Sequence, residues 1–184
     1  MTHRPDEADE PEVVEWTGRY MAAKRRGTWE YASRTRSIGA AVILPIDGAH
    51  IILIEQWRMA LMRNCLEFPA GLVGDEAGHE EDTPFAAAGR ELIEETGYSA
   101  ANWEEHGHFV TSPGMTDESF TLFKATGLTK VGQGGGVAGE SIEVHRVPIA
   151  SVRGLIAERR AAGSAIDVKL LLLLAAGILE SGAE

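Results

Sequence analysis

The sequence predicts an α/β fold, in which a mixed β-sheet packs between helices and a small β-sheet extension precedes it. Short apolar runs bounded by turn residues predict strands over residues 37–58 and 103–147. A helix-forming segment, Pro84 to Thr96, interrupts these strands, and two more helical segments follow them. This order of elements is typical of an α/β sandwich, and 184 residues suit one domain of that kind.

The first 36 residues predict a tail and a β extension. Residues 1–12 are rich in Asp, Glu and Pro, which predicts a flexible tail. Residues 13–36 alternate unevenly and are interrupted at Gly27, so we expect a hairpin or two strands. This extension is too short for a core of its own, and we expect it to pair two subunits in a homodimer.

Residues 37–184 are expected to form the main domain. Asp47-Gly48 predicts a hairpin turn, and Gly132 to Gly139 predicts a flexible loop that could close on a ligand. The expected strands are Ser37–Pro45, Ile51–Arg58, Cys65–Phe68, Trp103–Val110, Phe120–Thr126 and Ile142–Val147, and the expected helices after them are Pro148–Arg160 and Ala165–Leu179.

Composition excludes several classes of protein. A net charge of −11 without a basic stripe argues against a nucleic-acid partner. The single cysteine, Cys65, rules out an intrachain disulfide framework and is expected to be a buried thiol in a reducing cytoplasm. No secretory signal is visible, and the most apolar run, Leu170 to Leu179, is about half the length that spans a bilayer. We therefore expect no membrane partner.

The central helix carries the most informative residues of the chain. Pro84 suits the first helical turn after a cap at Thr83 or Asp82, and Gly97 suits a left-handed terminus. Glu91 and Glu95 then project from one face, with Glu94 beside them. A solvated acidic face is the simpler interpretation, but a hard cation such as Mg²⁺ would relieve the repulsion between these carboxylates.

The surrounding residues resemble the Nudix box. The similarity rests on Gly71, on Asp82 and on the run Arg90-Glu91-x-x-Glu94-Glu95-x-Gly97. It implies the α/β/α sandwich of Nudix hydrolases over residues 37–184, and hydrolysis of a nucleoside diphosphate linked to another group. This chain has Asp82 where the family usually has Glu, and extra residues at 74–81, but neither departure removes a carboxylate from the ligand face.

The resemblance also implies roles for the metal site. Glu91 and Glu95 would bind the metal together with the backbone carbonyl of Ala70, and Glu94 would be a ligand or would hold a bound water. Glu140 matches the second of two loop acids in ADP-ribose pyrophosphatases and could be base, ligand or both, while Ala138 replaces the first acid. Arg90 is expected to pair with Asp82 or a neighbouring acid.

Further residues resemble the substrate site of that subfamily. Ser112-Pro113-Gly114 by itself predicts only a turn, but its spacing after the box is similar to a loop that forms a wall near the ribose. Glu118 would accept hydrogen bonds from ribose hydroxyls.

Three residues before the box complete the substrate site that the resemblance implies. Arg58, which could also be a surface residue, would bind the pyrophosphate. Leu72 would line the cleft, although core packing explains it equally well. Trp29 would stack on adenine from the N-terminal extension, unless it belongs to a core.

These inferences lead to one expected function and two alternatives. We expect hydrolysis of ADP-ribose to AMP and ribose 5-phosphate, with Mg²⁺ as the cofactor and Mn²⁺ as the alternative ion. The first alternative is hydrolysis of another nucleotide sugar such as GDP-mannose. The second is a sensor that binds ADP-ribose on a Nudix fold without turnover.

Overall fold

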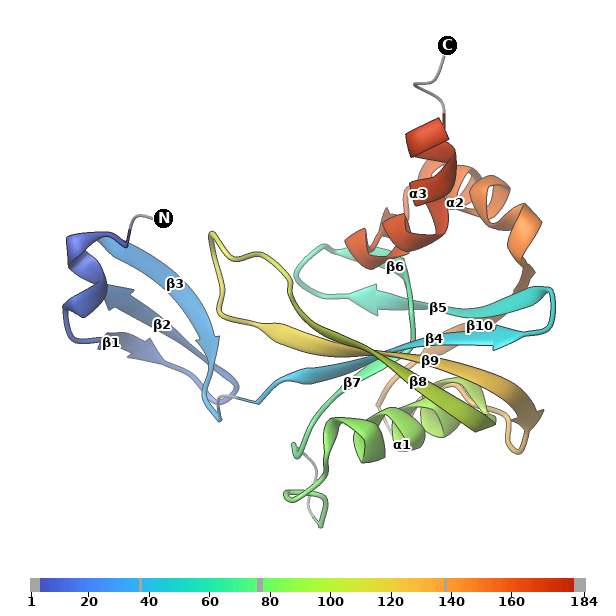
Figure 1. The fold of residues 1–184 in the computed structure, drawn as a ribbon, viewed down its shortest axis with the longest axis horizontal. Helices are drawn as coiled ribbons and strands as arrows, with labels where there is room; N and C mark the ends of the chain where they lie inside the picture. The colour runs from blue at the N-terminus through green and yellow to red at the C-terminus, as the bar shows by residue number, and fades with distance from the viewer. Residues whose placement is uncertain (1–3, 37, 76–77, 138, 181–184) are drawn as a thin grey trace.

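The computed structural model describes residues 4–36, 38–75, 78–137 and 139–180. At the amino end, Val13–Thr17 (β1), Met21–Arg26 (β2) and Trp29–Arg34 (β3) form an antiparallel sheet that stands apart from the main body (Figure 1). The sequence predicted a hairpin or two strands here, whereas the structure has three. Two tight turns fit into this short segment because Gly27 adopts a positive φ of 59° at the second one.

Part of the expected tail packs on this small sheet. Asp6–Asp9 form a 3-10 helix, and the Thr28 hydroxyl donates to both carboxylate oxygens of Glu7 at 3.0 Å. The tail is thus attached to the turn between β2 and β3.

The main sheet has eight strands and is mixed, which confirms the predicted fold class. Its order is β11-β6-β5-β4-β9-β8, with β10 paired to β5 and β7 paired to β4. The pairs β4–β9 and β6–β11 are parallel, and the others are antiparallel. The strands are Ala40–Asp47 (β4), His50–Arg58 (β5), Arg63–Glu67 (β6), Ala70–Leu72 (β7), Tyr98–Val110 (β8), Ser119–Lys130 (β9), Ile142–Pro148 (β10) and Ala165–Ile166 (β11).

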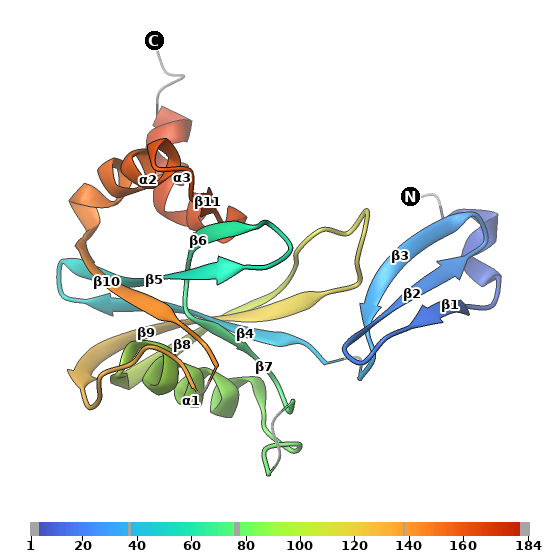
Figure 2. The same cartoon turned by 180° about the vertical axis from the view of Figure 1, so that it is seen from behind.

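Helices cover both faces of this sheet. Helix α1 (Pro84–Thr96) lies on one side, whereas α2 (Val152–Ala161) and α3 (Leu171–Glu180) lie on the other (Figures 1 and 2). Strand β4 separates the two cores by its period of two: Ala41 and Ile43 pack in the cluster under α1, and Val42 packs in the cluster under α2 and α3.

The predicted helix Ala165–Leu179 begins later than expected. Its first two residues form β11, whose backbone pairs with Cys65 and Leu66 of β6. The Asp167 carboxylate then accepts from the Lys169 backbone amide at 2.7 Å, which starts a 3-10 turn that leads into α3. None of the described helices is long and apolar enough to cross a membrane.

The loop between β8 and β9 ties the two sheets together. The Ala32 amide of β3 donates to the Met115 carbonyl at 2.8 Å, and the Asp117 amide donates to the Ala32 carbonyl at 3.3 Å. The Ser33 hydroxyl adds a bond to the Asp117 carboxylate at 2.6 Å. The loop that contains Ser112 is therefore bonded along the edge of the N-terminal sheet.

Candidate active site

Helix α1 forms as predicted from local signals. The Thr83 side chain accepts from the Ala86 amide at 3.2 Å, and Gly97 ends the helix with a φ of 72°. Ala87 and Leu92 are fully buried under the helix, and their small and branched side chains let it pack closely on the sheet. This packing orients the acidic face of α1 toward the strands β5, β6 and β7.

The glycine-rich loop is bonded to the carboxyl end of α1. The Gly135 and Gly136 amides donate to the Glu95 and Glu94 carbonyls at 2.9 and 3.0 Å, so they cap carbonyls that the helix leaves free. A Cβ atom on Gly134 would lie 2.4 Å from the Thr96 carbonyl carbon. Gly134 therefore allows close backbone contact with α1, and the amides of Gly135 and Gly136 bond this part of the predicted loop to the helix end.

A cavity of about 400 Å³ opens between α1, the strands and this loop. It brings together eight of the residues that the sequence suggested for the site, namely Arg58, Ala70, Leu72, Glu91, Glu94, Glu95, Glu118 and Glu140. The described residues that line the cavity do not include Ser112, Pro113, Gly114 or Trp29. Thr111, which directly precedes Ser112, does line it. Trp29 is 57% exposed on the N-terminal sheet and is not a core residue.

Several residues of the cavity were missed in the sequence. Those with charged or amide side chains are Arg34, Gln56, Glu67, Asp75 and Lys169. A signal existed for Glu67, because a lone acid between the apolar Leu66 and Phe68 requires a buried partner. Arg34 gave no comparable signal, since only the folded chain places it against Glu118, at 2.6 Å from Nη2 to Oε1.

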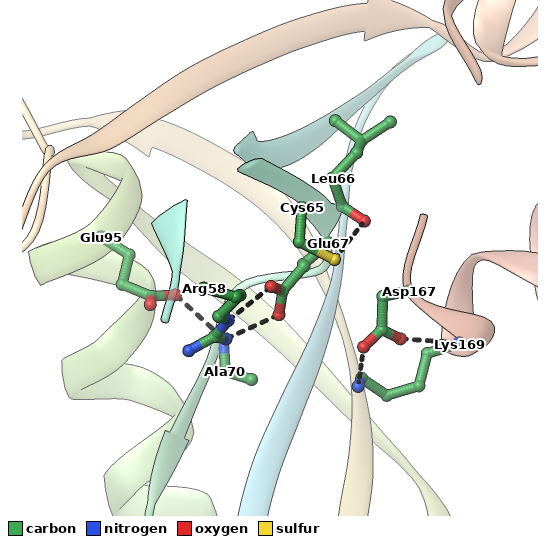
Figure 3. Close-up of polar contacts among 8 residues, drawn as sticks. All are labelled: Arg58, Cys65, Leu66, Glu67, Ala70, Glu95, Asp167 and Lys169. Atoms are coloured by element: carbon green, nitrogen blue, oxygen red, sulfur yellow. Dashed lines mark hydrogen bonds and ion pairs between the residues drawn. The ribbon is translucent and has the colours of Figure 1, made fainter. Parts of the chain in front are cut away.

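Glu95 is a buried carboxylate whose pKa is strongly shifted. It is only 4% exposed, and its Oε2 accepts from the Ala70 amide at 2.9 Å (Figure 3). Burial raises the pKa of Glu95 to about 8, the Ala70 bond opposes this rise, and the charges of Glu91 and Glu140 add to it. The protein thus holds a carboxyl group where its charged form is disfavoured.

These residues fit a divalent cation. Carboxylates are the oxygen ligands that hard cations prefer, and a cation would stabilise the charged form of Glu95. Gly71 supplies the necessary space, because a Cβ atom there would lie 2.0 Å from a carboxylate oxygen of Glu91. Glu91, Glu95 and Glu140 thus line one cavity and supply carboxylates of the kind that such a cation binds.

Arg90 holds the acidic face in place, as the sequence predicted. Its guanidinium lies 2.9 Å from Glu91, 3.2 Å from Glu94 and 3.7 Å from Asp82. Asp82 therefore reaches this network although it is one methylene shorter than the glutamate usual in the family.

Glu140 enters the cavity from the loop that follows the glycines. Its Oε2 accepts from the Val137 amide at 3.0 Å, and this oxygen would lie 2.4 Å from a Cβ atom on Gly136. Ala138, where the family has its first loop acid, lies outside the described residues. Glu140 thus contacts the turn that is bonded to α1.

The raised pKa of Glu95 has a consequence for pH dependence. Between the ordinary value of 4.5 and about 8, the folded protein keeps a proton on this group that the unfolded chain has lost. The free energy of unfolding of the metal-free protein should therefore fall as pH rises through this window.

Binding of a divalent cation near neutral pH should in turn release about one proton from Glu95. Calorimetric Mg²⁺ titrations in buffers of different ionisation enthalpy measure this proton. Glu95→Gln should abolish the release, and equal release from the wild type and this variant would contradict the assignment.

A second group of metal-ligating residue types lies outside this cavity. Glu55, Glu143 and His145 offer ligand atoms within 4.8 Å of one another. The Glu55 carboxylate, however, already accepts from the Ser164 hydroxyl at 2.6 Å and lies 2.9 Å from Nε of Arg159. The Arg159 guanidinium already neutralises Glu55, so the pair is a structural ion pair that links α2 to β5.

An α/β sandwich with an acidic helix and a cation-suited cavity defines the class of the protein. The chain belongs to the Nudix family, because the NUDIX domain model matches residues 34–165. The match includes β3 residue Arg34 and every carboxylate of the cavity.

Individual relatives support the same placement. The chain is 39% identical over 93 residues to an ADP-ribose pyrophosphatase of Mycobacterium tuberculosis, a match that covers 50% of this chain and 43% of that protein. It is 34% identical over 148 residues to a GDP-mannose pyrophosphatase of Cronobacter sakazakii, which covers 76% and 72% of the two chains. The matched region spans about half the length of the first of these curated relatives.

A solved structure shows the same fold. The crystal structure of an ADP compounds hydrolase superposes with a TM-score of 0.68 over 95% of both chains, at 21% identity. This likeness extends over the small N-terminal sheet as well as the main domain, since it covers nearly the whole chain.

Proposed function

We propose that this protein hydrolyses the pyrophosphate of ADP-ribose, giving AMP and ribose 5-phosphate, with Mg²⁺ as the cofactor. The observation that carries the proposal is the cavity in which Arg58 faces the carboxylates of α1. An anionic diphosphate suits such a site only when a metal and a guanidinium offset the acidic charge. The ADP-ribose pyrophosphatases among the relatives favour this substrate.

The residues of the cavity have distinct tasks in this reaction. Glu91, Glu95, Glu140 and the Ala70 carbonyl would hold the metal, which when bound neutralises the diphosphate and lowers the pKa of water. Arg58 binds and orients the phosphates. Glu140 accepts the proton of the attacking water, whose oxygen bonds to phosphorus while the bridging P–O bond breaks.

A panel of nucleotide sugars with product identification tests this proposal. ADP-ribose with Mg²⁺ should yield AMP and ribose 5-phosphate in equal amounts, and excess EDTA should stop the reaction. Binding of ADP-ribose without AMP formation would instead identify a sensor. Replacement of Mg²⁺ by Mn²⁺ in the same assay determines the preferred ion.

GDP-mannose is the second candidate substrate. It is favoured by the GDP-mannose pyrophosphatase relative, whose match covers more of both chains than that of the mycobacterial relative. In the panel, this function would appear as GMP released from GDP-mannose at a higher kcat/KM than AMP from ADP-ribose.

We further propose that the N-terminal sheet pairs two subunits in a cytoplasmic homodimer. Val14 and Trp16 on β1 and Met21 on β2 are exposed, and the three-stranded sheet has little core of its own. Such an apolar surface is typical of an interface. In the dimer, Trp29 would reach the adenine across the subunit boundary.

Light scattering at micromolar concentration should therefore report a dimer. Trp16→Glu should shift it to the monomer, because it places a charge in the apolar contact. Met59→Glu alters an even more exposed apolar residue outside the sheet and should leave the dimer intact. A wild-type monomer would contradict this arrangement.

A further inference from the structure

Glu67 lines the cavity and accepts hydrogen bonds from Arg58 with both of its carboxylate oxygens. Oε1 accepts from Nε and Oε2 accepts from Nη2, each at 2.6 Å (Figure 3). Two parallel bonds of this kind fix the plane of a guanidinium as well as its position. Glu67 ends β6, directly opposite Ile54 of β5, so the side chain of Arg58 runs back along its strand to reach it.

The two partners differ in exposure. Glu67 is 4% exposed, whereas the side chain of Arg58 is 43% exposed and lines the cavity. The carboxylate also raises the pKa of Arg58 above its ordinary value. A buried partner therefore anchors one edge of a guanidinium whose remaining edge is open to a ligand.

The remaining edge is directed at the proposed reaction site. Figure 3 shows Arg58 between Glu67 and the Ala70–Glu95 hydrogen bond. Nη1 has no hydrogen-bond partner among the described residues, while Nε and Nη2 are both used by Glu67. Without Glu67, the guanidinium would be free to pair with the cavity carboxylates Glu91, Glu95 or Glu140, which attract the same charge.

We propose that Glu67 is a positioning residue, which holds Arg58 so that Nη1 faces a diphosphate bound in the cavity and keeps the guanidinium away from the metal carboxylates. This inference rests on the proposed function and adds the residue that orients its phosphate ligand. It assigns no metal contact to Glu67, because both of its oxygens are already occupied by Arg58.

Binding of methylenediphosphonate, a diphosphate that cannot be hydrolysed, tests this role. With saturating Mg²⁺, Glu67→Gln should weaken its binding about tenfold in calorimetry, the loss expected when a charged hydrogen-bond partner is removed. Glu67→Asp keeps the charge but is one methylene too short to hold both nitrogens, so it should weaken binding as well. Arg58→Gln should weaken binding, and adding Glu67→Gln to it should cause no further loss.

Glu55→Gln is the matched control. Glu55 is also a buried strand carboxylate paired with an arginine, Arg159, but it lies outside the cavity. Thermal unfolding of both variants separates lost stability from lost affinity. Glu55→Gln should keep wild-type affinity for methylenediphosphonate even if its Tm falls.

Several results would overturn the proposal. These are unchanged affinity in folded Glu67→Gln and Glu67→Asp, additive losses in the double variant, or no binding of methylenediphosphonate by the wild type. A weaker Mg²⁺ affinity caused by Glu67→Gln when Arg58 is already replaced by Gln would make Glu67 a metal ligand and also overturn it, because no guanidinium is then left to compete for the carboxylates. Failure of the proposed function is a separate result, since it appears as absence of AMP from ADP-ribose in the wild type.

Discussion

Glu95→Gln is expected to lower kcat by about 10³-fold, because removal of a charged metal ligand forfeits several kcal/mol of transition-state stabilisation. The fold should survive, since Gln preserves an oxygen that can accept the Ala70 amide bond. The metal-free variant should even gain stability above neutral pH, because it no longer buries a group whose charged form is disfavoured. Steady-state rates with Mg²⁺, together with thermal unfolding, measure both effects.

Glu158→Gln provides the control for this experiment. Glu158 is also a helical glutamate, but its side chain is largely exposed on α2 and lies outside the cavity. The Glu158→Gln variant should hydrolyse ADP-ribose at the wild-type rate. If Glu95→Gln shows wild-type hydrolysis at saturating substrate and modest Mg²⁺, Glu95 is not a metal ligand.

Glu140→Gln is expected to lower kcat by about 10²–10⁴-fold with a smaller change in KM, the usual share of a general base. The geometry supports this expectation, because Glu140 projects into the cavity from a turn that is bonded to the end of α1. If Glu140 is only a metal ligand, increasing Mg²⁺ should restore much of the rate. The measurement is therefore kcat as a function of Mg²⁺ concentration.

Glu143→Gln is the matched control in the same segment. Glu143 is three residues further along, but it lies 3.7 Å from His145 and does not line the cavity. A Glu140→Gln rate within about threefold of wild type at every Mg²⁺ concentration would reject both roles. Glu94 would then be the next candidate for the base.

The features that the sequence predicted correctly depend on neighbours along the chain. The cap at Thr83, the left-handed Gly97 and the spacing of Glu91 and Glu95 need only a few consecutive residues, so they determine α1 and its acidic face locally. The burial of Cys65 follows in the same way from the apolar run around it, and burial raises its pKa to about 12.

The features that were missed depend on residues that are distant in sequence. Arg58 resembles a free phosphate ligand in the sequence, but the register of β5 and β6 brings it to Glu67. Arg34 and Glu118 are 84 positions apart and meet only because the loop after β8 bonds to β3. No local pattern contains such a pair.

The sequence by itself therefore determined the acidic helix α1, the fold class and most of the acidic residues of the cavity. Tertiary structure decided that Gly135 and Gly136 cap α1, that Ala165–Ile166 join the sheet, and which buried partner holds each charged side chain. The physical reason is that caps and periodicity act over one or two turns of the chain, whereas buried ion pairs form only after strand register has brought distant segments together.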